Sequence, residues 1–181
     1  MKNTKKLTLS AVMVAMGTVF MAIGAYVEAL DLTTVALASL LMVFVYIEIG
    51  SPYTWLVWLC TTLASALMYF GSPIWVEYFL VFGIYPVIKG YIERLPRSIW
   101  LLLKLIYANL TFAALALGLE FVLKIPFLAE NEDFFGLPTY AVYIIIGIVL
   151  NIAFVAYDFF INVMVRYYMQ RLRSRFKSLL K

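Results

Sequence analysis

The chain has 181 residues, of which 65% are hydrophobic and 13% are charged, and its formal net charge is +4. A soluble domain of this length does not need so much apolar surface to build one core, so the composition argues against a water-soluble protein. The sequence contains no histidine, which removes the commonest general base and the commonest metal ligand. We therefore expect no metal, no cofactor and no enzymatic activity.

Two long uncharged runs identify the class of protein. There are 21 consecutive uncharged residues between Lys6 and Glu28, and 24 between Asp133 and Asp158. As a helix, each run is long enough to cross roughly 30 Å of hydrocarbon. Both runs are apolar on every face, whereas strands of a membrane barrel alternate apolar and polar residues. The sequence predicts an all-α integral membrane protein.

The turn signals divide the chain into a six-helix transmembrane domain over residues 1–165 and a tail over 166–181. Two Gly-Ser-Pro sequences, at 50–52 and 71–73, predict tight turns between antiparallel helices. Gly83 and Pro86 should bend the fourth helix or end its regular part early. The expected helices cover residues 7–27, 32–48, 53–70, 74–89, 98–122 and 140–165.

The positive charges predict the orientation of these helices. With six crossings, Lys89 at the inner end of the fourth helix and all but one of the lysines and arginines outside the spans fall on one side of the membrane, which predicts that both ends are cytoplasmic. The localisation expected is the bacterial plasma membrane, as a multi-pass protein. The tail places Tyr168, Leu172, Phe176 and Leu179 at helical spacing among basic residues, so we expect it to lie along the inner leaflet. Membrane anchoring explains these residues without a nucleic-acid partner.

Charged residues within the spans are the first candidates for function, because each costs about 2.5–3.5 kcal/mol on insertion scales. Lys104 and Asp158 should lie at similar depth, where they can pair, and Glu48 is placed to join them in the cytoplasmic half. One interpretation is a structural ion pair, or a Lys104 that extends to the inner headgroups. The other is a role in transport or gating.

Polar and aromatic residues nearer the outer face suggest a ligand site. Asn109 and Asn151 should meet near the middle of the membrane, where a hydrogen bond would satisfy both, as a structural contact or as part of a site. The remaining candidates can line a pocket or form an interfacial belt, and the acids among them would favour a cationic ligand. They are Trp75, Glu77, Glu120, Tyr140 and Tyr143.

Helix one carries small residues at a helical spacing. Ala11 and Ala15 are four residues apart on one face, with Ser10, Gly17 and Gly24 nearby. Small residues let another helix approach closely in lipid, where no hydrophobic effect drives helices together. The stripe predicts a docking surface, either for another helix of the same bundle or for a separate subunit.

The opening KKLTLSAVMVAM, followed by six spans in about 180 residues, resembles the substrate-binding S-components of energy-coupling-factor transporters. The resemblance implies ATP-driven uptake of a vitamin or similar small molecule, bound near the outer face by helices four to six and the first outer loop. It also implies that Ala11 and Ala15 contact the coupling helices of a transmembrane subunit, which is driven by ATPases in other chains. Glu28 to Asp31, the first outer loop, is short for closing over a substrate.

Two other functions compete with this hypothesis. The size and helix count are also similar to a rod-shape protein of the MreD type, a non-transporting scaffold or assembly protein that would recruit a partner through helix one and the basic tail. An intramembrane enzyme using Glu77, Glu120 or Asp158 is disfavoured, because the sequence lacks a paired acidic metal motif and a nucleophile elbow.

Overall fold

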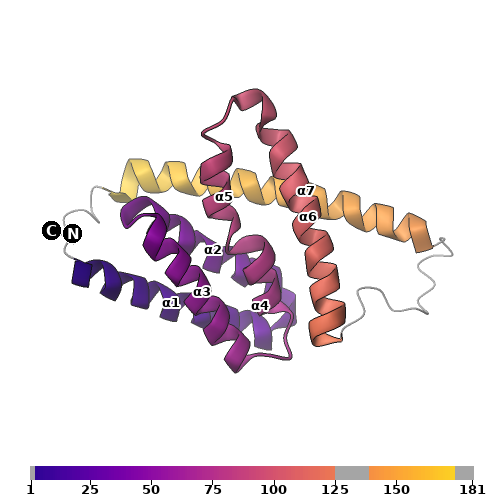
Figure 1. Cartoon of the computed structure of the whole chain (residues 1–181), viewed down its shortest axis with the longest axis horizontal. Helices are drawn as coiled ribbons and strands as arrows, with labels where there is room; N and C mark the ends of the chain where they lie inside the picture. The colour runs from indigo at the N-terminus through magenta and orange to yellow at the C-terminus, as the bar shows by residue number, and fades with distance from the viewer. Residues whose placement is uncertain (1–2, 125–138, 174–181) are drawn as a thin grey trace.

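The computed structural model describes residues 3–124 and 139–173, and every regular element in these ranges is helical (Figure 1). The α-helices are α1 (Asn3–Tyr26), α2 (Asp31–Glu48), α3 (Ser51–Met68), α4 (Ile74–Glu77), α5 (Tyr85–Ile92), α6 (Trp100–Gly118) and α7 (Thr139–Tyr167). Short 3₁₀ or π segments join or extend them: η1 (Glu28–Leu30), η2 (Tyr78–Phe82), η3 (Arg97–Ile99), η4 (Leu119–Leu123) and η5 (Tyr168–Leu172). The all-α prediction is confirmed for the described residues.

Within the described ranges, four helical stretches are long and apolar enough to cross a membrane. They cover Asn3–Tyr26, Asp31–Glu48, Arg97–Leu123 and Tyr140–Arg171. These stretches indicate a membrane protein, as the composition predicted. α3 and the α4 to α5 segment do not meet the same standard of length and apolarity, so six crossings with both ends inside stays a prediction.

The first three helices form one half of the core. α1 packs against α2 and α3 through Gly17 and Gly24, and buried Met21 lies between these two glycines. A Cβ atom at Gly24 would come within 2.2 Å of Thr34 Oγ1, so glycine is needed for this close approach. The turns before α3 and after it occur at the predicted Gly-Ser-Pro sequences.

The fourth predicted helix is broken, as Gly83 and Pro86 indicated. It consists of α4, the π segment η2, a turn at 83–84, and α5, which extends three residues beyond the predicted end at Lys89. A π segment disturbs the regular ladder of backbone hydrogen bonds, and proline has no N–H for the carbonyl four residues before it. The carbonyl groups of η2 therefore need other donors.

Aromatic side chains from three other helices supply these donors. Trp58 Nε1 of α3 donates to Phe79 O at 3.2 Å, and the Tyr107 hydroxyl of α6 donates to Val81 O at 3.0 Å. Tyr157 of α7 reaches Phe82 O at 3.5 Å. Backbone polar groups within a membrane must be satisfied by protein, so these contacts satisfy the condition that a broken helix would have to meet there.

The last two long helices cross near the middle of both (Figure 1). The last helix was predicted to end at Val165, but its helical path continues through Tyr167 and η5 to Arg173. In this extension the Tyr168 ring packs edge-on against Phe44 of α2, with centroids 5.4 Å apart. This part of the predicted tail thus contacts the bundle, while Phe176 and Leu179 lie outside the described residues.

Candidate functional site

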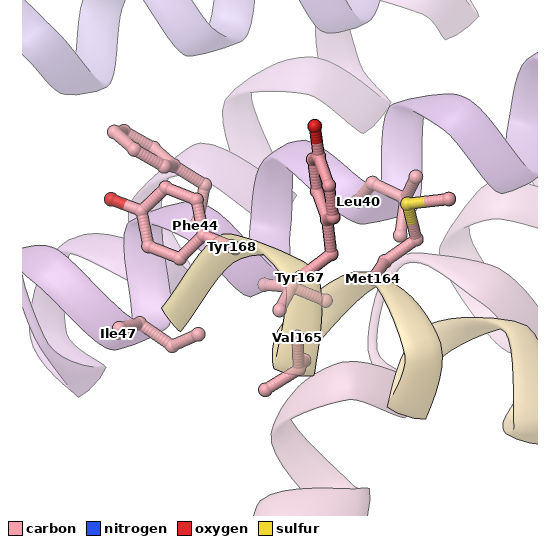
Figure 2. A pocket seen from close by; sticks show the side chains of 8 residues that line it. Leu40, Phe44, Ile47, Met164, Val165, Tyr167 and Tyr168 are labelled. Atoms are coloured by element: carbon pink, nitrogen blue, oxygen red, sulfur yellow. The ribbon is translucent and has the colours of Figure 1, made fainter. Parts of the chain in front are cut away.

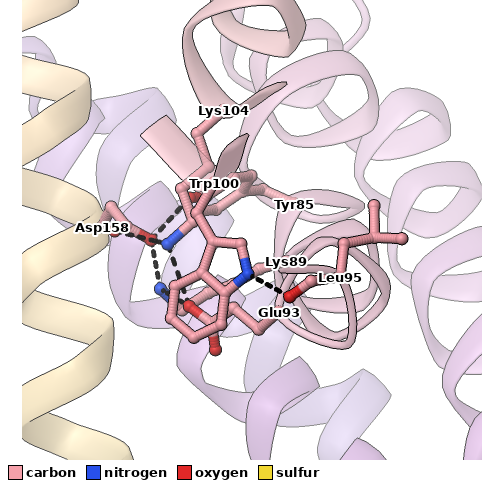
Figure 3. Close-up of polar contacts among 7 residues, drawn as sticks. All are labelled: Tyr85, Lys89, Glu93, Leu95, Trp100, Lys104 and Asp158. Atoms are coloured by element: carbon pink, nitrogen blue, oxygen red, sulfur yellow. Dashed lines mark hydrogen bonds and ion pairs between the residues drawn. The ribbon is translucent and has the colours of Figure 1, made fainter. Parts of the chain in front are cut away.

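A buried charge cluster joins α5, α6 and α7. Lys104 Nζ lies 2.8 Å from Asp158 Oδ2 and 3.0 Å from Oδ1, so the two residues meet as their depths suggested (Figure 3). Their side chains are 8% and 16% exposed. Lys104 Nζ also lies 5.8 Å from the centroid of the Trp100 ring, within the range of a cation–π contact.

Three further residues of α5 or its end complete this charge cluster. Lys89 Nζ contacts Asp158 Oδ1 and lies 2.9 Å from Glu93 Oε1, and Lys104 Nζ lies at the same distance from that oxygen. The Tyr85 hydroxyl donates to Asp158 Oδ1 at 2.5 Å. Two cations therefore share two carboxylates, so the cluster is formally neutral and each lysine has more than one partner.

The sequence did not predict Lys89, Glu93 and Tyr85 as members of the cluster. The fourth helix was expected to end at Lys89, whereas the structure continues α5 to Ile92. A usable signal was present, because positions 85, 89 and 93 are four residues apart and share one face of a helix. A helix with this polar face is expected to turn the face toward the other buried charges, Lys104 and Asp158.

Glu48 does not join this cluster. Its Oε1 accepts from Arg173 Nε at 3.0 Å, which ties the end of α2 to the extension of α7. The two ion-pair sites are therefore separate. The prediction that Glu48 shares a polar site with Lys104 and Asp158 is wrong. Glu48 pairs instead with Arg173, because α7 continues far enough to bring Arg173 to it.

A layer of aromatic rings lies between the charge cluster and the middle of the bundle. The Tyr85 ring lies 4.7 Å from Phe154 and 5.7 Å from Tyr157. The Tyr157 hydroxyl is 2.5 Å from Ser39 Oγ of α2, so this layer is also tied to the first half of the core. The cluster and the layer together hold α7 against α2, α5 and α6.

Asn109 and Asn151 form the interhelical contact that their depths predicted. Asn109 Nδ2 donates to Asn151 Oδ1 at 3.0 Å, and Asn151 Nδ2 donates back to Asn109 Oδ1 at 3.1 Å. Each amide also donates to a carbonyl one turn earlier in its own helix, Leu105 O and Gly147 O. The pair uses both amide groups on each other, which leaves it as a packing contact between α6 and α7.

Replacing Asn109 with leucine should reduce stability only slightly. Interhelical hydrogen bonds in membranes are worth about 0.6 kcal/mol on average, and Asn151 keeps its bond to Gly147 O. We expect a loss below about 1 kcal/mol for N109L and for N151L, and the same loss for the double variant as for either one. Unfolding in mixed detergent micelles measures all three, and a coupling above about 2 kcal/mol would contradict a purely packing role.

A cavity of about 460 Å³ lies on the opposite side of the aromatic layer. Its walls come from α2, from Glu77 and η2, from α6 and η4, and from α7, and nearly all of the lining is apolar. Phe154 and Tyr157 of the aromatic layer belong to this lining. The volume falls in the range of about 300–1,000 Å³ that small-molecule sites occupy.

Glu77 is the one acidic or basic residue that the described residues place in this lining. Its Oε2 is buried and has no hydrogen-bond partner in the described part of the chain. Asp31, at the start of α2, is within electrostatic reach of it. An apolar cavity with a single carboxylate residue in its lining is the arrangement by which a polar group orients a mostly apolar ligand.

The other outer candidates lie outside the cavity lining. Trp75 donates from Nε1 to Phe70 O at 3.1 Å and stacks on the Phe70 ring, and Glu120 is exposed. Tyr140 and Tyr143 are 70% and 51% exposed. Because these aromatic side chains are exposed and lie outside the cavity lining, they fit the interpretation as an interfacial belt better than the interpretation as pocket residues.

The face of helix one that carries Ala11 and Ala15 is exposed. Both residues are exposed, whereas Ser10, Gly17 and Gly24 are buried on the opposite face against the bundle. The small residues thus divide into two sets. The buried set, Ser10, Gly17 and Gly24, packs against α2 and α3. The exposed set, Ala11 and Ala15, makes no such packing within the described chain.

An apolar groove of about 280 Å³ runs between α2 and the end of α7 (Figure 2). Leu40, Phe44, Met164 and Tyr167 are among its lining residues, and the lining holds no charged side chain. Figure 2 shows the Tyr168 ring beside Phe44 at one end of the groove. Such a surface is ordinary for helices that face lipid.

Comparison with known proteins gives no relative: no family model, no curated protein and no solved structure matches this chain. Its function must be argued from the cavity, the charge cluster and the exposed face of α1.

Proposed function

We propose that the protein is the solute-binding subunit of a membrane transport system, organised like the S-components that its opening sequence resembles. The cavity of about 460 Å³ carries the proposal, because it offers a small molecule a mostly apolar enclosure with one acidic residue in the described lining. It is built from the ends of helices that the charge pattern directs outward. Charged residues of the cluster lie on its inner side, beyond Phe154 and Tyr157.

The exposed face of α1 supports the part of the proposal that concerns partners. A transport subunit without ATPase motifs needs another chain to couple it to ATP hydrolysis. Ala11 and Ala15 are exposed while the buried glycines of α1 hold it to the bundle, so the face of α1 that carries the two alanines is available for a second protein. We assign this face to a transmembrane coupling subunit.

Mass spectrometry of small molecules retained through mild purification tests the binding function. The wild-type chain is expected to retain one compound of a size that fits the cavity. Filling the cavity with A36F should remove that compound, since Ala36 lies in the lining, whereas A113F on an exposed face of α6 should retain it. Retention of lipid alone by all three proteins would contradict the proposal.

Replacing Ala11 and Ala15 together with tryptophan is expected to abolish co-purification with the coupling subunit, because bulky side chains prevent close helix approach. Affinity purification of the tagged chain from native membranes, with mass spectrometry of the bound proteins, measures this loss. Met16 and Ile23 are also exposed but lie on a different part of α1, so M16W/I23W is the matched control and should keep the complex. Equal recovery of the complex with both variants would contradict the assignment, and a scaffold would recover no ATPase at all.

A further inference from the structure

We infer that the ligand of the cavity is a monovalent ammonium ion with an apolar, ring-containing body. This inference rests on the proposed function and names the class of molecule that the cavity takes. It depends on three features of the lining: its single acid, its apolar walls and its aromatic floor.

The acid fixes the charge of the ligand. Glu77 Oε2 is buried without a hydrogen-bond partner among residues 3–124 and 139–173, and no lysine or arginine contributes to the described lining. A buried carboxylate with no counter-ion is costly, and Asp31 nearby adds a second negative group rather than a compensating one. A ligand that brings a positive charge and an N–H donor to the Glu77 carboxylate satisfies both needs, whereas an anionic ligand would increase the repulsion.

The walls of the cavity determine the chemistry of the uncharged part of the ligand. Apolar side chains such as Leu115, Ile146 and Leu150 line the cavity on α6 and α7. At its floor, the rings of Phe82, Phe154 and Tyr157 lie together, with Phe82 and Tyr157 centroids 4.9 Å apart. Ring faces attract both apolar rings and cations, so they complement the same kind of ligand. The Tyr157 hydroxyl is already hydrogen-bonded to Ser39, so it adds no free polar group to this floor.

The test compares two probes that differ in charge but hardly in shape. 4-Phenylbutylammonium and 4-phenylbutan-1-ol are titrated into the full chain in phosphatidylcholine nanodiscs, with empty nanodiscs as the blank for partition into lipid. We expect the wild-type protein to bind the ammonium at least about tenfold more tightly than the alcohol. In E77Q this preference should disappear, because glutamine keeps the shape and removes the charge. The matched control E120Q changes an exposed acid outside the lining and should keep the preference.

The possible outcomes distinguish failure of the cationic ligand class from failure of the cavity as a ligand site. If both probes bind equally to the wild-type chain and A36F blocks both, the cavity is a ligand site and only the cationic class is overturned. If the ammonium preference survives in E77Q, Glu77 is not its cause and the inference is likewise overturned. If neither probe binds, the ammonium class is overturned, while the retained-compound experiment still decides the proposed function. If the ammonium binds and A36F leaves its binding unchanged, the cavity is not the site and the proposed function fails with it.

Discussion

Replacing Asp158 with leucine is expected to reduce the free energy of unfolding by about 3–5 kcal/mol. Asp158 accepts from both lysines and from the Tyr85 hydroxyl, so its removal leaves two buried ammonium groups with Glu93 alone. Breaking one partner out of a buried ion network is costly, because the charges that remain keep their desolvation penalty. Unfolding in mixed detergent micelles, followed by far-ultraviolet circular dichroism, measures the loss.

A second variant shows whether charge balance is the cause. D158L/K104M removes one acid and one base, which leaves Lys89 with Glu93 at 2.9 Å as a matched pair. This double variant should be more stable than D158L, even though it carries one more substitution. If it is less stable than the single variant, the cluster contributes through packing, and the interpretation as an ion network must be abandoned.

The sequence predicted the features that depend on single segments. Uncharged runs between Lys6 and Glu28 and before Asp158 gave the helical membrane class, since length and composition alone determine it. Gly83 and Pro86 gave the break in the fourth helix, because their effects on the backbone are local. Counting residues along the last two predicted helices, on the assumption that they are antiparallel, was enough to bring Lys104 to Asp158 and Asn109 to Asn151.

Features that need several helices at once were harder to predict. Lys89 was counted among the charges at the cytoplasmic end, which made it look like a topology signal rather than a buried partner of Asp158. Glu48 was assigned to the wrong partner, since nothing local tells how far α7 continues to Arg173. The cavity takes its walls from four parts of the chain, and only Glu77 was singled out among its lining residues.

The structure places the cavity and the charge cluster on either side of one aromatic layer. Phe154 lines the cavity and touches Tyr85, and Tyr85 binds Asp158. These rings therefore lie between the cavity and the ion network. The broken helix supplies both sides, because η2 lines the cavity and α5 carries Lys89. The turn between them is therefore the place where one substitution should disturb both.

Replacing Gly83 with alanine is the test of that turn, and we expect a loss of about 1–3 kcal/mol in stability. A Cβ atom there would come within 2.7 Å of the carbonyl oxygen of Tyr78 and 2.8 Å of Trp58 Cδ1. The backbone oxygen cannot rotate away as a side chain can, so η2 must shift and the Trp58 bond to Phe79 O should weaken. Thermal unfolding in detergent measures the stability, and 4-phenylbutylammonium titration measures the cavity, where we expect weaker binding.

Gly147 provides the matched control for this variant, because it lies in α7 and a Cβ atom there meets nothing within 4 Å. G147A should keep probe binding and change stability by no more than about 1 kcal/mol, in the stabilising direction, since alanine favours helix over glycine. Similar effects of G83A and G147A would mean that the broken helix tolerates a methyl group at its turn. In that case the close contact of Gly83 with Tyr78 and Trp58 would not be what positions η2 beside the cavity.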